Sequence, residues 1–120
     1  MSLKDYIDKF KKKYIETKVS YAHKPDFKPS SIVRKHIIFS GKVQNVGFRY
    51  ETYQLANSIG LKGWVKNKVD GTVESEIQGE NDKITFLISH MKSLKRGRVI
   101  DVKIKEIDLI DNDNNFEIIR

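Results

Sequence analysis

The stretch of sequence that decides the fold is HIIFSGKVQNVGFRYETYQLANSIG, residues 36–60. It opens with a β-branched and aromatic run over residues 36–43, which predicts a strand because such side chains suit a pleated surface. Over residues 48–58 the apolar side chains recur at helical spacing, and Gly60 follows as a helix-ending residue. The stretch therefore predicts a strand, a short loop with two glycines and a helix in direct succession.

The rest of the chain continues the same alternation of strand and helix periods. Two segments of alternating apolar residues surround Val69-Asp70-Gly71, and Asp-Gly between such segments predicts a β-hairpin. A second segment of helical spacing and two more strand-like segments follow. The predicted elements are strand 36–43, helix 48–58, strands 61–68 and 72–78, helix 81–94, and strands 99–110 and 116–119.

This order is β-α-β-β-α-β with a short fifth strand at the C-terminus. It predicts an α+β fold of the ferredoxin-like split-βαβ plan, in which an antiparallel sheet carries two helices on one face. The chain of 120 residues suits one such domain. We place that domain at residues 34–120 and treat residues 1–33 as an N-terminal extension.

Charge is unevenly divided between these two parts. The chain carries 23 Lys and Arg against 16 Asp and Glu, a net charge of +7. Residues 1–35 hold ten basic and four acidic side chains, which gives +6, and residues 36–120 hold thirteen and twelve, which gives +1. A domain that binds nucleic acid through its surface usually carries the positive excess itself. Nucleic acid is therefore not the expected partner of the domain.

The basic extension has a pattern of its own. Residues 3–16 place their apolar side chains in one helical stripe, and Pro25 and Pro29 mark the following segment as a linker. We expect the stripe to dock on the domain or on a second chain. A membrane surface or nucleic acid is the alternative partner of this helix.

Composition excludes several classes of function. The chain has no cysteine, which rules out a disulfide framework, a thiolate metal site and a cysteine nucleophile and fits a reducing, cytoplasmic location. Its three histidines lack paired ligand spacing, so no metal site is predicted. The longest apolar runs are too short to span a membrane, and residues 1–10 lack the apolar core of a secretory signal.

The loop before the first helix has the composition of an anion-binding site. Residues 41–49 read GKVQNVGFR, and the two glycines and Asn45 tolerate positive φ, which lets backbone N–H groups curl inward. The loop leads into a helix N-terminus, the positive end of the helix dipole. Arg49 in the first helical turn is within reach of the same concavity, which favours a phosphoryl ligand. The alternative is a plain strand–helix turn with a surface arginine, and the spacing does not match a Walker A loop.

A second polar candidate, Asn67, stands at the end of the strand that precedes the hairpin. An amide side chain both donates and accepts hydrogen bonds, so it can hold a water molecule in line with a bound phosphorus atom. Taken alone, an asparagine at this position is more often simply a polar residue next to a turn.

The two motifs together resemble the acylphosphatase family. G-x-V-Q-x-V-G-F-R over residues 41–49 and G-W-V-x-N-x-x-D-G-T-V-E over residues 63–74 occur in the order and spacing of that family. The resemblance covers about residues 34–120 and implies hydrolysis of small-molecule acyl phosphates to carboxylate and phosphate without metal or cofactor. It implies that Arg49 is catalytic and binds the phosphate, while Asn67 is catalytic and positions the attacking water. The backbone amides implied in phosphate binding are those of Gln44, Asn45, Val46, Gly47, Phe48 and Arg49.

The resemblance has two departures. Asn45 stands where the family usually has glycine, but asparagine is the next best residue for a left-handed backbone, so we expect the phosphate-binding loop to form. Residues 95–98 lack the prolines often found there, a change that we place at the rim of the site. Phosphate or sulfate ions are the expected product mimics, and no oligomeric state is predicted.

One other function remains open from the sequence. The same domain is also compatible with a catalytically weak, acylphosphatase-like module that binds a phosphorylated partner or nucleic acid. RNA recognition domains share the β-α-β-β-α-β plan. Here, however, the strand over residues 72–77 is acidic and lacks the aromatic side chains on which RNA bases stack.

Overall fold

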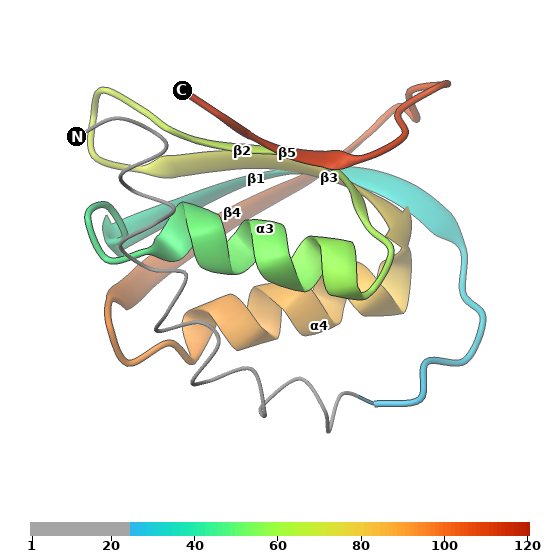
Figure 1. Cartoon of the computed structure of the whole chain (residues 1–120), viewed down its shortest axis with the longest axis horizontal. Helices are drawn as coiled ribbons and strands as arrows, with labels where there is room; N and C mark the ends of the chain where they lie inside the picture. The colour runs from blue at the N-terminus through green and yellow to red at the C-terminus, as the bar shows by residue number, and fades with distance from the viewer. Residues whose placement is uncertain (1–24) are drawn as a thin grey trace.

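The computed structural model describes residues 25–120, so the helix predicted over residues 3–16 lies outside the described residues. Within that range the chain forms one sheet with two helices on one face (Figure 1). This arrangement confirms the predicted ferredoxin-like α+β fold. The elements are β1 (Ile32–Lys42), α3 (Phe48–Ser58), β2 (Lys62–Asn67), β3 (Val73–Glu80), α4 (Asn81–Lys92), β4 (Arg98–Ile107) and β5 (Phe116–Ile119).

The sheet has the strand order β4-β1-β3-β2-β5. The first four strands pair antiparallel, as predicted, whereas β5 runs parallel to β2. The sheet is therefore mixed. The reason is directional: the chain turns back after β4 and runs in the sense of β1, which is also the sense of β2.

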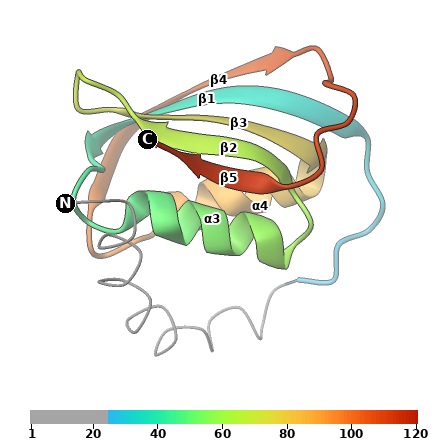
Figure 2. The same ribbon diagram turned by 45° about the horizontal axis from the view of Figure 1, so that its top comes forward.

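The hydrophobic core lies between the sheet and the two helices (Figure 2). Every second residue of β1 and β3 points into it, and each helix presents one apolar stripe to it. The ring of Phe39 in β1 packs edge to face against Phe48 at the start of α3, with 4.9 Å between the ring centroids. This contact fixes the direction in which α3 leaves the loop. The core side chains include Ile37, Phe39, Val65, Val73 and Ile77 from the strands and Phe48, Leu55, Ile84, Leu87 and Met91 from the helices.

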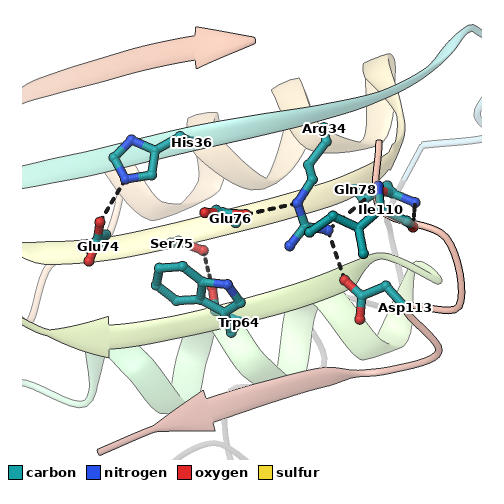
Figure 3. A network of polar contacts seen from close by, with 9 residues as sticks. All are labelled: Arg34, His36, Trp64, Glu74, Ser75, Glu76, Gln78, Ile110 and Asp113. Atoms are coloured by element: carbon teal, nitrogen blue, oxygen red, sulfur yellow. Dashed lines mark hydrogen bonds and ion pairs between the residues drawn. The ribbon is translucent and has the colours of Figure 1, made fainter. Parts of the chain in front are cut away.

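The opposite face of the sheet is polar, and the β4–β5 connection is fastened across one end of it (Figure 3). Arg34 is only 2% exposed, and its guanidinium donates from Nε to Glu76 Oε1 at 2.9 Å and from Nη1 to Asp113 Oδ2 at 2.8 Å. Gln78 exchanges two hydrogen bonds with the backbone of Ile110. β1 begins at Ile32, four residues before the predicted start. The earlier start is possible because the ion pairs of Arg34 stabilise a buried charged residue within the strand.

The centre of this polar face is acidic on β3 and basic on the neighbouring strands. His36 Nε2 lies 2.7 Å from Glu74 Oε2, and Lys66 Nζ lies 3.5 Å from the other oxygen of Glu74. The hydrogen bond with His36 holds the pKa of Glu74 below its ordinary value, although desolvation opposes it. Two glutamates of the acidic strand, Glu74 and Glu76, thus lie on the outer face of the sheet with their charges paired.

The residues just before β1 pack against α4. The ring of Phe27 meets Phe86 edge to face, with 5.5 Å between the centroids. Ser30 Oγ accepts a hydrogen bond from the backbone N–H of Asp82 at 3.2 Å. The N-cap residue of α4, Glu80, makes no side-chain capping hydrogen bond, so this serine supplies the cap from a distant part of the chain.

Candidate active site

Three connections meet at one end of the molecule, at the left of Figures 1 and 2. They are the β1–α3 loop, the β2–β3 hairpin and the α4–β4 connection. The first two contain the two motifs that the sequence singles out, and the structure therefore brings both motifs to the same end of the sheet. The polar fastening around Arg34 lies at the other end of β1.

The β1–α3 loop has the backbone conformation that the sequence predicts. Asn45 has φ 62° and Gly47 has φ 79°, both in the left-handed region. Gly47 is also the N-cap of α3 and, as a glycine, has no side chain with which to cap this helix end. Because the first N–H groups of a helix have no partner within the helix, an end without a side-chain cap offers them to an anion.

Gln44 ties this loop to the β2–β3 hairpin through its side chain. Its Nε2 donates to the carbonyl oxygens of Lys68 at 2.8 Å and Thr72 at 3.0 Å. The hairpin is itself ordered by Asp70, whose Oδ1 accepts hydrogen bonds from the backbone N–H and the hydroxyl of Thr72. The sequence assigned Gln44 only a backbone role. Its side-chain role could not be read from the local sequence, because the two carbonyl acceptors belong to a hairpin that lies 24 and 28 residues further along the chain.

Arg49 and Asn67 stand on the elements that this contact joins. Arg49 is the second residue of α3, and its Nε atom is buried. Asn67 is the last residue of β2 and pairs with Val73, so its side chain is on the helix-facing side of the sheet. Its Oδ1 atom is buried and accepts no hydrogen bond within residues 25–120. A buried acceptor without a donor costs about 1–3 kcal/mol, so such an atom is a strong candidate for contact with a bound water or substrate.

A further arginine contacts the loop from the α4–β4 connection. Arg96 Nε donates to the carbonyl oxygen of Val46 at 3.2 Å, and Arg96 Nη2 donates to Glu51 Oε1 at 2.5 Å. Burial raises the pKa of Glu51, but hydrogen bonds from His90 and Arg96 outweigh it and hold the pKa below its ordinary value. The sequence placed residues 95–98 at the rim of the site, whereas Arg96 contacts the loop itself. The available signal was Glu51, an acid on the apolar face of a helix, which requires a buried partner.

Neither a metal-ligand cluster nor a membrane-spanning helix occurs in the described part of the chain. Residues 25–120 contain no group of three or more His, Cys, Asp or Glu side chains arranged to hold a metal ion. No helix in this range is long and apolar enough to cross a membrane.

Fold and site together define a class of protein. It is a ferredoxin-like domain in which a left-handed loop at a helix N-terminus, followed by an arginine, is joined to the strand end that carries a buried amide. Such an arrangement is suited to binding a phosphate group.

Comparisons with known proteins identify the family. The acylphosphatase family model matches residues 35–118. The chain is 42% identical over 84 residues to an acylphosphatase from Picrophilus torridus, which covers 68% of this chain and 95% of that relative. It is 40% identical over 87 residues to one from Chlorobaculum tepidum, covering 72% and 95%. The crystal structure of acylphosphatase from Bacillus subtilis matches with a TM-score of 0.69 and 31% identity, covering 75% of this chain and all of that one. The chain therefore belongs to the acylphosphatase family and is a hydrolase.

Proposed function

We propose that this protein hydrolyses small-molecule acyl phosphates to a carboxylate and inorganic phosphate, by in-line attack of water on phosphorus. The observation that carries the proposal is the contact between the two motifs of the family. Gln44 of the first motif donates both hydrogen bonds of its amide nitrogen to the backbone of the second. The loop and the strand end that carries Asn67 are thereby held as one unit.

The loop and Arg49 form the phosphate-binding part of the site. The backbone N–H groups of residues 44–49 and the guanidinium bind the phosphate oxygens, where negative charge is concentrated during transfer. Two left-handed residues, Asn45 and Gly47, give the loop its curl. Since the donors are already placed before the reaction, little reorganisation is needed in the transition state.

Asn67 positions the nucleophile. Its Oδ1 accepts a hydrogen bond from the attacking water, which leaves a lone pair of the water oxygen free to face phosphorus. The burial of this oxygen atom and its lack of a donor within the described residues support the role.

The bond changes require no separate base from the protein. A bond forms between the water oxygen and phosphorus while the bond from phosphorus to the acyl oxygen breaks. The carboxylate leaves as a stable anion, and the proton of the water passes to an oxygen of the substrate's own phosphate. Catalysis then depends on positioning and charge stabilisation, as in other phosphoryl transfers.

Hydrolysis of benzoyl phosphate by the full chain in ¹⁸O-labelled water, with EDTA present, tests both activity and mechanism. Attack on phosphorus places the label in inorganic phosphate, which is the expected result. Label in benzoate would show attack on the carbonyl carbon and overturn the mechanism. A protein that binds phosphate but does not hydrolyse benzoyl phosphate would favour the binding-module alternative.

A further inference from the structure

The α4–β4 connection lies directly against the outer side of the phosphate-binding loop. Arg96 donates to the Val46 carbonyl, and a Cβ atom on the next residue, Gly97, would collide with the carbonyl oxygen of Lys42. The same Cβ would stand 3.1 Å from Val46 Cγ2. Only glycine at position 97 allows the connection to lie this close to the loop, and the close approach places Arg96 next to one peptide of the loop.

That peptide joins Val46 to Gly47. A trans peptide is planar, and its C=O and N–H groups point in opposite directions. The structure has no cis peptide among its described residues. When Arg96 holds the carbonyl oxygen of Val46, the N–H of Gly47 must therefore point to the opposite side, away from Arg96. Gly47 precedes the first turn of α3, where helix hydrogen bonds do not fix the orientation of this peptide.

Arg96 is in turn held by a buried carboxylate. Its Nη2 donates to Glu51 Oε1, and the Glu51 side chain is only 5% exposed. His90 Nε2 lies 3.4 Å from the other oxygen of Glu51. The backbone N–H of Glu51 donates to the carbonyl oxygen of Gly47 at 3.0 Å, so the carboxylate belongs to the same helical turn as the loop.

The two contacts of Arg96 use the planar shape of its side chain. In the plane of the guanidinium, Nε donates to a carbonyl and Nη2 donates to a carboxylate, in a fixed geometry. A lysine carries the same charge on a single nitrogen and cannot reproduce this pair of contacts with the same geometry. The arrangement is suited to fixing an orientation as well as supplying charge.

We propose that Arg96 is a positioning residue of the phosphate-binding loop. It holds the Val46–Gly47 peptide so that the N–H of Gly47 faces the phosphate, and Glu51 holds Arg96 in place for this task. Arg96 does not touch the substrate. The inference rests on the proposed function, because it assigns this N–H to the binding of phosphate.

The test compares Arg96→Met and Arg96→Lys with a matched control, Arg98→Met, in the full chain. Arg98 is exposed at the start of β4, two residues further on. We expect Arg96→Met to raise the inhibition constant of inorganic phosphate and lower kcat/KM for benzoyl phosphate, each by about tenfold to a hundredfold. Arg96→Lys should stay close to the Met variant, and Arg98→Met should match the wild type. Rescue by lysine would show that charge alone is needed and would overturn the positioning role.

A second readout separates positioning from stability. In the wild type, titration with inorganic phosphate should move the ¹H resonance of the Gly47 amide downfield, and in Arg96→Met this shift should be lost while melting temperature remains well above the assay temperature. Arg96→Lys keeps the positive charge but not the two fixed contacts and should also lose most of the shift, so the inference stays testable if Arg96→Met fails to fold. An unchanged Gly47 shift in Arg96→Met would overturn the inference alone. A wild type that neither hydrolyses benzoyl phosphate nor binds phosphate would overturn the proposed function instead.

Discussion

Two arginines hold the two ends of β1, and they do so in different ways. Arg34 at the start of the strand donates to two carboxylates, Glu76 and Asp113, so within residues 25–120 its guanidinium contacts side chains and no backbone carbonyl. Arg96, beyond the other end, donates to one carboxylate and one backbone carbonyl. Gln44 likewise donates to carbonyls. The arginine at one end of the sheet thus pairs with carboxylates, whereas the arginine at the other end also holds a backbone carbonyl of the loop.

The largest difference between the ends should appear on changing Arg49. Arg49→Ala removes a preorganised donor to the phosphate, which typically costs about 3–4 kcal/mol of transition-state stabilisation, or a 10²- to 10³-fold loss of kcat/KM. Steady-state hydrolysis of benzoyl phosphate measures this loss. Arg98→Ala, which removes an exposed arginine on β4, is the control and should be nearly silent. Near-normal turnover by Arg49→Ala would show that Arg49 has no role in catalysis.

Changing Arg34 should give the opposite profile. Arg34→Met leaves two partly buried carboxylates without their cation, and we expect a loss of about 2–3 kcal/mol in the free energy of unfolding. The folded variant should keep its kcat/KM. Urea denaturation gives the first quantity, and activity at low temperature gives the second. A variant that is stable but inactive would mean that the two ends are coupled, against the division drawn above.

A change at Asn67 separates two roles within the candidate active site, positioning of the attacking water and binding of phosphate. Asn67→Ala removes the acceptor for the attacking water, so kcat should fall about tenfold to a hundredfold while the inhibition constant of phosphate changes little. Asn57→Ala, at an exposed position on α3, is the matched control. Weaker phosphate binding with kcat intact would instead make Asn67 part of the phosphate-binding loop.

The smallest predicted effect is a dependence on pH. The pKa of Glu51 is lowered in the folded protein, so the ionised carboxylate adds stability that is fully present above its unfolded pKa, near 4.5. This stability is lost as pH falls through the lower, folded pKa. The stability difference between the wild type and Glu51→Gln, measured by urea denaturation, should therefore shrink below about pH 4.5. A difference that grows on acidification would contradict this direction.

The sequence predicted those parts of the fold that depend on local patterns. Helix 48–58 and strand 116–119 have the predicted bounds, and the hairpin at Asp70-Gly71 is present. In these places periodicity and turn residues act over a few positions. The early start of β1 was missed because Arg34 owes its burial to partners 42 and 79 residues away.

The candidate site follows the same division. Its motif residues came from the resemblance to a family, and the left-handed backbone at Asn45 follows from residue type alone. The side-chain role of Gln44 and the contact of Arg96 with Val46 were not predicted. Those contacts join residues 24 to 50 positions apart and depend on how the connections come together.

The serine that caps α4 has a consequence for how the protein folds. Ser30 and Asp82 are separated by 52 residues, so this cap closes a long loop. Most helix caps are local and form together with their helix, whereas this one becomes available only once the chain before β1 lies beside the sheet. We therefore expect the first turn of α4 to be capped late in folding, because this contact has a high sequence separation. The hydrogen bond between the Ser30 hydroxyl and the N–H of Asp82 is thus present only when the segment before β1 is packed against α4.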